Sequence, residues 1–214
     1  MKPSFTFEAA ALSSGHAIIC GIDEAGRGPW AGPVCAAAVI LDQRNIPQGL
    51  NDSKKLSEAK RDHLFPLIIA TAEVGIGLAS AQEIDEINIL QATYLAMGRA
   101  IEALKSRPTL ALIDGNRAPK LFCATQTIIG GDAKSLSIAA ASIIAKVTRD
   151  RLMIEMDKAF PAYGFAKHKG YGTAFHASAL AQHGPCTEHR FSFAPIRKLT
   201  MKSDINSHGD SEDS

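Results

Sequence analysis

The chain lacks several features that would point to a particular chemistry. Its four cysteines lie far apart and form no C-x-x-C pair, which argues against a zinc site or redox chemistry. Its seven histidines show no H-E-x-x-H or similar metal-binding spacing. No apolar run is as long as a membrane span, and the N-terminal residues do not resemble a signal peptide. We therefore expect a cytoplasmic protein with no membrane partner.

An excess of charge of either sign is also missing. Lys and Arg number 23 and Asp and Glu number 22, so the net charge is +1 and neither indicates nor excludes a polyanionic partner. Any site for such a partner would need Lys and Arg clustered locally. With 46% apolar and 21% charged residues among 214, the composition is that of an ordinary globular protein with a sizeable core.

Short apolar runs alternate with helical patterns along the chain. Strands are expected at about 17–20, 34–41, 73–80, 110–113 and 122–129. Helices are expected at about 57–70 with a bend at Pro66, from Ser80, from Asn88 to about Lys105, at 133–159 and at 176–182. This order predicts an α/β fold with a mixed central β-sheet flanked by helices and a helical C-terminal extension.

Domain organisation follows from the same pattern. Residues 1–15 show no clear periodicity, so we expect a loosely ordered N-terminal lead-in. Residues 16–200 are expected to form one domain. Residues 201–214 are polar and acidic with almost nothing to bury, which predicts a disordered tail.

The stretch 20–34 places two adjacent acids, Asp23 and Glu24, directly after a buried strand and before three glycines and two prolines. Neighbouring residues on a strand point to opposite faces, so these two side chains cannot both lie in the core. Two carboxylates this close repel each other unless a cation or a proton lies nearby. Taken alone, the stretch fits a tight hairpin with acids at its rim equally well.

Two further strands end in acids, at Asp114 and Asp132. In an open α/β sheet, ligands collect beyond the strand ends. Four carboxylates meeting there would need cations to stay ionised, and oxygen ligands with open positions suit Mg²⁺ or Mn²⁺. Two such ions, about 4 Å apart, would activate a water and stabilise the leaving oxygen of a phosphodiester. Each acid taken singly is an ordinary surface residue, but three glycine-flanked strand ends together favour a metal site.

Basic residues in the neighbouring segments could supply the other half of a nucleic-acid site. Lysine and arginine bind phosphates without reading sequence, and the candidates are Lys54, Lys134, Lys146, Arg149, Lys167 and Lys169. Taken alone, each of these residues fits an ordinary charged side chain exposed to solvent. Tyr171 lies between two glycines, so its ring could stack on a sugar or a base, or could simply anchor its loop.

Taken together, these motifs resemble the ribonuclease HII family, the type 2 ribonucleases H. The resemblance covers about residues 17–198 and follows the family's order through G-I-D-E-A-G-R-G at 21–28, D-S-K-K-L at 52–56, I-D-G-N at 113–116, G-D-A-K-S at 131–135, K-G-Y-G-T at 169–173 and H-R-F-S-F at 189–193. The first and fourth of these motifs together are highly specific. The acidic tail falls outside the pattern.

The resemblance implies an RNase H-like fold and an endonuclease that cuts the RNA strand of RNA–DNA hybrids. It also implies cleavage at single ribonucleotides embedded in duplex DNA, as in ribonucleotide excision repair, leaving a 5′-phosphate and a 3′-hydroxyl. By the same resemblance, the catalytic and metal-binding residues would be Asp23, Glu24, Asp114 and Asp132, and the cofactor would be two ions of Mg²⁺ or Mn²⁺.

Substrate contacts follow in the same way. The resemblance assigns Gly26, Arg27 and Gly28 to the ribose 2′-hydroxyl and the nearby backbone, and Tyr171 to the RNA–DNA junction. We also expect substrate contacts from basic residues of the same region, namely Lys54, Lys146 and Arg149. The protein is expected to act as a monomer. A 2′-hydroxyl is what distinguishes RNA from DNA at one nucleotide, which agrees with glycines that let backbone approach it.

Two alternatives remain open from the sequence. The acid cluster could serve another phosphoester, such as a DNA junction. The chain could instead be a non-catalytic hybrid-binding module whose Lys and Arg do the binding, although four acids beside a phosphate site would oppose binding unless metal neutralised them.

Overall fold

The computed structural model describes residues 2–199, which fold around one five-stranded sheet. The strands are β1 (Ile19–Ala25), β2 (Val34–Leu41), β3 (Ala72–Ala79), β4 (Leu110–Asp114) and β5 (Ala124–Ile128). Their order across the sheet is β3-β2-β1-β4-β5. The pairs β1–β2 and β2–β3 are antiparallel, whereas β1–β4 and β4–β5 are parallel. The mixed central sheet predicted from the sequence is confirmed.

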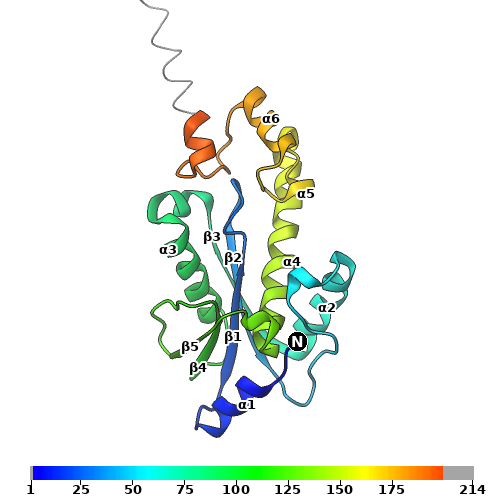
Figure 1. The fold of residues 1–214 in the computed structure, drawn as a ribbon, viewed down its shortest axis with the longest axis vertical. Helices are drawn as coiled ribbons and strands as arrows, with labels where there is room; N and C mark the ends of the chain where they lie inside the picture. The colour runs from blue at the N-terminus through cyan, green and yellow to red at the C-terminus, as the bar shows by residue number, and fades with distance from the viewer. Residues whose placement is uncertain (1, 200–214) are drawn as a thin grey trace, which may run out of the picture.

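Helices cover both faces of the sheet (Figure 1). On one face lies α3 (Ala81–Glu102), and on the other lie α2 (Glu58–Thr71) and α4 (Leu136–Ala159). Alternate residues of strand β2 pack into two different hydrophobic clusters. Ala36 and Ala38 pack in the cluster that includes α3, whereas Ala37 and Val39 pack in the cluster that includes α4. A strand buried on both faces reads as a continuous apolar run, which explains its simple sequence.

Strand β1 and helix α4 pack unusually closely at Gly21. A Cβ atom at this position would lie 2.2 Å from the carbonyl carbon of Ser137, so only glycine fits. The close approach brings the first turn of α4 onto the strand that carries Asp23. The glycine therefore lets α4, which follows Asp132 in the chain, pack against this strand.

Two helix caps read from the sequence, Ser57 and Asn88, are confirmed. Ser57 Oγ accepts a hydrogen bond from the Lys60 backbone N–H at 3.3 Å and caps α2. Asn88 interrupts α3 with a φ of 67°, and its Oδ1 accepts from the backbone N–H groups of Leu90 and Gln91. The two helices expected here are thus two segments of α3 joined at a capped kink.

A helical extension lies beyond the end of the sheet, where the second half of α4 meets the C-terminal part of the chain (Figure 1). It contains the 3₁₀ turn η3 (Pro161–Tyr163), α5 (Phe165–His168) and α6 (Ala174–His183). Met153, Phe165, Leu180 and Ile196 belong to its own apolar cluster. The extension therefore has a core separate from the two faces of the sheet.

The N-terminal segment differs from the loosely ordered lead-in that we expected. It forms α1 (Thr6–Ser13), and Glu8 on this helix is 2% exposed. Glu8 Oε1 accepts hydrogen bonds from Ser135 Oγ, Ser137 N–H and Ser137 Oγ at 2.6, 2.9 and 2.6 Å. This buried carboxyl group attaches the helix together with only two apolar side chains, Phe7 and Ala11, so hydrophobic periodicity gave little sign of it.

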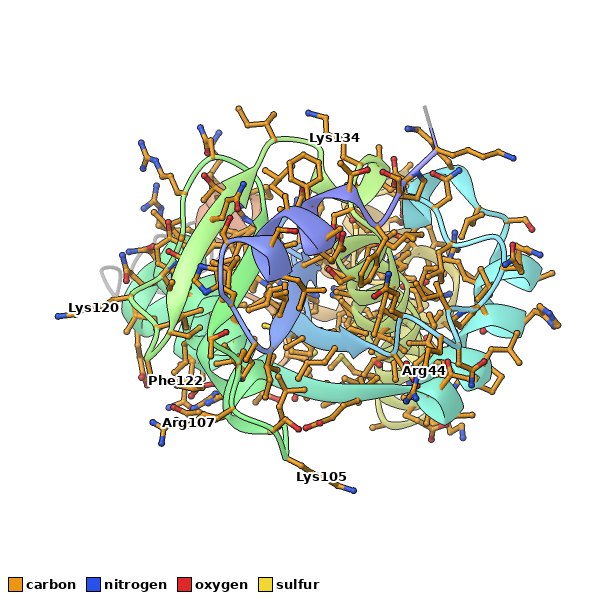
Figure 2. The ribbon with its side chains drawn as sticks, turned by 90° about the horizontal axis from the view of Figure 1, so that it is seen from below. Arg44, Lys105, Arg107, Lys120, Phe122 and Lys134 are labelled. Atoms are coloured by element: carbon orange, nitrogen blue, oxygen red, sulfur yellow. The ribbon has the colours of Figure 1, made fainter. Side chains whose placement is uncertain are left out.

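The acidic tail predicted at 201–214 lies outside the described residues. Within residues 2–199, no helix combines the length and the apolar character needed to cross a bilayer. Figure 2, which views the molecule from below, shows Lys134 pointing outward at the rim. At another edge of the same view, the Arg107 guanidinium lies 4.7 Å from the centre of the Phe122 ring.

Candidate active site

Three of the four predicted acids meet at one point. Asp23 lies near the end of β1, Asp114 is the last residue of the neighbouring parallel strand β4, and Asp132 lies in the 3₁₀ turn η2 (Gly131–Ala133) just before α4. One carboxylate oxygen from each lies within 4.8 Å of the other two. Parallel pairing of β1 with β4 and the close packing at Gly21 bring these three side chains together.

Backbone hydrogen bonds orient two of these carboxylates. Asp23 Oδ1 accepts from the Glu24 N–H at 2.7 Å, and Asp114 Oδ1 accepts from the Gly131 N–H at 2.7 Å. The second bond ties the end of β4 to the turn that carries Asp132. Because each carboxylate uses one oxygen in this way, the other oxygen stays available for a ligand.

Glu24 stands apart from the three-acid group. Its Oε1 accepts a hydrogen bond from Arg27 Nη1 at 3.3 Å, and the two residues form an ion pair. Glu24 lines a cavity of about 330 Å³ together with Asp114 and Arg27, and also lines the cleft described below. It lies between two hollows rather than inside the acid cluster.

Burial and mutual repulsion disfavour the ionised acids. Burial, followed by the charges of Glu24 and Asp114, raises the pKa of Asp23 well above its ordinary value. Burial and then the charges of Asp114 and Asp52 raise the pKa of Asp132 to about 6. Burial also raises the pKa of Glu24, although Arg27 opposes the shift. Such a group of acids is poised to bind a cation or a proton.

Lys54 is a basic side chain coupled to the three-acid group. It lies in the 3₁₀ turn η1 (Ser53–Lys55). Partial burial disfavours its charge, but the carboxylates of Asp23, Asp132, Asp52 and Asp114 outweigh this effect and raise its pKa. Its turn is attached to α4, since the Ser53 N–H donates to Ser142 Oγ at 3.3 Å. The ammonium group therefore partly balances the acid cluster.

A cleft of about 400 Å³ opens beside the acids and contains most of the remaining predicted site residues. Its lining includes Asp23, Glu24, Gly26, Arg27, Gly28, Lys54, Lys146, Arg149 and Tyr171. The Tyr171 ring is 47% exposed, and a Cβ atom on Gly28 would lie 3.7 Å from its Cε1. Segments separated by more than a hundred residues in the sequence thus form one surface.

The other basic candidates, Lys134, Lys167 and Lys169, are not part of this lining. Lys134 Nζ donates to the Ile129 carbonyl, Lys167 Nζ lies over the Phe175 ring, and Lys169 Nζ donates to the Ala166 carbonyl. Lys146, which does line the cleft, forms an ion pair of 2.7 Å with Asp150.

Arg149, from which we expected a substrate contact, lines the cleft but is buried. It is 1% exposed, and its guanidinium donates to the carbonyls of Pro33, Lys169 and Ala31 at 2.9, 3.0 and 3.2 Å. A guanidinium that has these three acceptors holds the loops around it. In this structure Arg149 supports the cleft from beneath.

Sequence reasoning gave no role to a second buried arginine, Arg190, which lies under the glycine-rich loop. Its guanidinium donates to the carbonyls of Gly26, Arg27 and Gly32 at distances from 2.6 to 3.0 Å. Arg190 is fully buried. Its place in the H-R-F-S-F motif was the only sequence signal, and nothing in that motif indicates what the side chain touches.

A mixed five-stranded sheet with acids at the ends of adjacent strands and a basic cleft beside them defines a nuclease of the RNase H-like fold. The family model for ribonuclease HII matches residues 20–196. The chain is 57% identical over 200 residues to a ribonuclease HII of Parvibaculum lavamentivorans, covering 93% of this chain and 74% of that relative. It is also 57% identical over 202 residues to the ribonuclease HII of Magnetococcus marinus, covering 92% and 95% of the two chains.

A solved structure agrees with the sequence relatives. The crystal structure of ribonuclease H2 from Pyrococcus horikoshii is similar with a TM-score of 0.72 and 27% identity, over 87% of this chain and 98% of that one. The chain therefore belongs to the ribonuclease HII family, and it is an endonuclease of the hydrolase class that acts on RNA in RNA–DNA hybrids.

Proposed function

We propose that this chain hydrolyses the RNA strand of RNA–DNA hybrids and also cuts at single ribonucleotides embedded in duplex DNA. The observation that supports this most directly is the shared position of the acid cluster and the cleft. Asp23 belongs to both, so a phosphodiester bound in the cleft lies beside the carboxylates. Sequence-independent contacts to phosphate and sugar are sufficient for such a substrate.

The acid cluster fits a divalent metal centre. Asp23 and Asp132 are 6% and 7% exposed, and with Asp114 they offer three oxygen ligands within 4.8 Å of one another. Hard oxygen donors with open positions suit Mg²⁺ or Mn²⁺. Asp23, Asp114 and Asp132 would hold the ions, with Glu24 at the edge of the group. Two bound ions would supply an activated water and stabilise the leaving 3′ oxygen of the phosphodiester.

The loop at Gly26, Arg27 and Gly28 is proposed to recognise the ribose 2′-hydroxyl. Arg190 donates hydrogen bonds to the carbonyls of Gly26 and Arg27 from the buried side, so this backbone is held in place before a substrate binds. Gly26 has a φ of 96°, and a Cβ atom there would lie 1.9 Å from Arg149 Nε. Only glycine permits this path of the chain, and a preformed backbone can distinguish ribose from deoxyribose.

Tyr171 is proposed to pack at the junction between RNA and DNA. Its half-exposed ring lies beside Gly28, so one wall of the cleft presents both a ribose reader and an aromatic surface. Lys54 and Lys146 line the same cleft and would contact flanking phosphates. The expected products carry a 5′-phosphate and a 3′-hydroxyl, and we propose that the protein acts as a monomer.

The test is cleavage of a DNA duplex that carries one ribonucleotide, with an all-DNA duplex and a continuous hybrid in parallel. Asp23→Asn and Asp132→Asn should each lower the rate in Mg²⁺ or Mn²⁺ by about 100-fold or more, because they remove groups that hold charge at the reacting centre. Asp62→Asn, an exposed position on α2, is the matched control. Wild-type rates for either variant would contradict the metal assignment, and equal cleavage of the all-DNA duplex would favour a DNA nuclease.

A further inference from the structure

Three successive carbonyl groups of the Tyr171 loop are held by three different donors from outside the loop. The Lys169 carbonyl accepts from Arg149 Nη1 at 3.0 Å, and the Gly170 carbonyl accepts from the Trp30 N–H at 2.8 Å. The Tyr171 carbonyl pairs with His176 Nδ1 at 3.0 Å. The Tyr171 carbonyl also accepts from the Thr173 N–H at 2.9 Å, so His176 is its donor from outside the loop and not its only donor. The loop that carries Tyr171 is thus held at three successive residues.

His176 does not stand alone. Its Nε2 lies 3.0 Å from Nε2 of His189, and both side chains are fully buried. The Nδ1 of His189 in turn lies 3.0 Å from the backbone N of Cys186. A buried row of polar contacts therefore runs from Cys186 through His189 and His176 to Tyr171.

The partners at the two ends fix the proton positions in this row. A carbonyl oxygen can only accept, so His176 Nδ1 carries the proton that it donates to Tyr171. The Nε2 of a neutral His176 is then an acceptor, and His189 must donate to it from its own Nε2–H. That leaves His189 Nδ1 as the acceptor for the Cys186 N–H at 3.0 Å, which is nearer than the Sγ and the carbonyl oxygen of the same residue at 3.2 and 3.3 Å.

This arrangement requires both rings to be neutral. A second proton on His176 would place two donors face to face at the 3.0 Å contact between the Nε2 atoms. A second proton on His189 would lie on its Nδ1 and face the Cys186 N–H, which is also a donor. Burial, followed for His189 by the charge of His176, lowers the pKa of both residues, and that of His189 falls to about 4. Two further ionisable rings face the pair: His168 is stacked on His176 with ring centres 4.5 Å apart, and Tyr163 lies edge-on to His189 with ring centres 4.9 Å apart.

We propose that His176 and His189 are positioning residues for Tyr171: their Nε2–Nε2 hydrogen bond holds the tyrosine loop in the place from which its ring meets the RNA–DNA junction. This inference rests on the proposed function of Tyr171. It predicts that the pair governs the preference for a single ribonucleotide, where the junction must be recognised, over a continuous hybrid. The pair itself touches no substrate.

Variants that keep volume but differ in hydrogen bonding test this role. His176→Leu removes the donor to the Tyr171 carbonyl, whereas His176→Asn keeps an N–H donor near the Nδ1 position. His189→Leu and His189→Gln make the same comparison for the donor to His176 Nε2. Leucine removes this donor, whereas the glutamine amide can donate in place of the His189 Nε2–H. His183→Leu is the matched control, because this exposed histidine lies on the same helix, α6.

The readouts separate positioning from folding. For His176→Leu we expect kcat/KM on the single-ribonucleotide duplex to fall about tenfold, mainly through KM, the scale of one lost hydrogen bond. The rate on a continuous hybrid should change much less, and His176→Asn should restore most of the loss. The chain has one tryptophan, and the Trp30 ring lies 5.5 Å from the His176 ring. Its fluorescence therefore reports on this region without a label.

A change in Trp30 emission together with a lower junction preference supports the proposal. Equal losses on both substrates, or a loss that His176→Asn does not restore, would overturn it. Tyr171→Ala distinguishes the two levels of inference. If Tyr171→Ala leaves junction cleavage unchanged, the proposed role of the tyrosine fails. If it impairs cleavage while the Leu variants at His176 and His189 do not, only the positioning role fails.

Discussion

The attachment of α1 to α4 through Glu8 leads to a sharp prediction about stability. The Glu8 carboxyl group is buried at the first turn of α4 and accepts from Ser135 Oγ, Ser137 Oγ and the Ser137 N–H. Glu8→Ala removes the acceptor for all three donors. The backbone hydrogen bonds that join Ser4 to Lys134 and Leu136 remain, so the variant loses one of the attachments between the N-terminal segment and α4.

The magnitude can be worked out from these contacts. Ser135 Oγ and Ser137 Oγ lie 3.1 Å apart, so in the variant the two hydroxyls can partly satisfy each other. The Ser137 N–H then has no side-chain acceptor in a buried position, which costs about 1–3 kcal/mol. The packing that α1 loses adds to this cost. Part of the cost is offset because the variant no longer buries Glu8 Oε2, which has no hydrogen-bond partner. We expect Glu8→Ala to lower the free energy of unfolding by about 2–3 kcal/mol.

The assay is urea unfolding followed by circular dichroism, with thermal unfolding in parallel. A loss of this size should lower Tm by about 5–10 °C for a chain of this length. Glu58→Ala is the control, because Glu58 is an exposed acid in the first turn of α2. Glu8→Gln, which keeps an acceptor oxygen, should lose less than half as much. If Glu8→Ala and Glu58→Ala proved equally stable, the reasoning about this buried cap would be refuted.

Two further outcomes follow from the site. The pKa of Asp132 is raised to about 6 from its ordinary 3.8, so the metal-free protein becomes less stable as pH rises through this interval. Asp132→Asn should therefore stabilise the metal-free protein at pH 8 by about 1–2 kcal/mol, and Mg²⁺ should stabilise the variant less than the wild type in the same urea titration. The lysine in Arg190→Lys cannot reproduce the contacts to Gly26, Arg27 and Gly32. We therefore expect the free energy of unfolding to fall by about 3 kcal/mol and the KM for the single-ribonucleotide duplex to rise. The exposed substitution Arg44→Lys is the control.

Several parts of the fold could be predicted because their signals are local. The capped starts of α2 and of the second segment of α3 follow from the side chains of Ser57 and Asn88. The apolar run of β2 is visible because its residues are buried on both faces. Asp114 and Asp132 could be grouped with Asp23 because acids at strand ends gather at one edge of a sheet.

What could not be predicted depends on contacts between distant segments. Nothing in the sequence distinguishes a buried Arg149 that holds three carbonyls from a surface arginine that holds a phosphate. The attachment of helix α1 includes a carboxyl group that meets serines more than a hundred positions later. His176 and His189 have no metal spacing, and their partnership exists only after α6 and the segment behind it fold together. Local pattern carries no information about such pairs.

The two buried arginines have a consequence for how the cleft responds to salt. Arg149 and Arg190 are at most 1% exposed, and although burial lowers the pKa of both, to about 9 for Arg190, they remain cationic at neutral pH. Mobile ions screen exposed lysines within about 10 Å at 0.1 M ionic strength, but they cannot surround charges beneath the surface. Part of the attraction for a polyanion therefore comes from the floor of the cleft and persists at higher ionic strength.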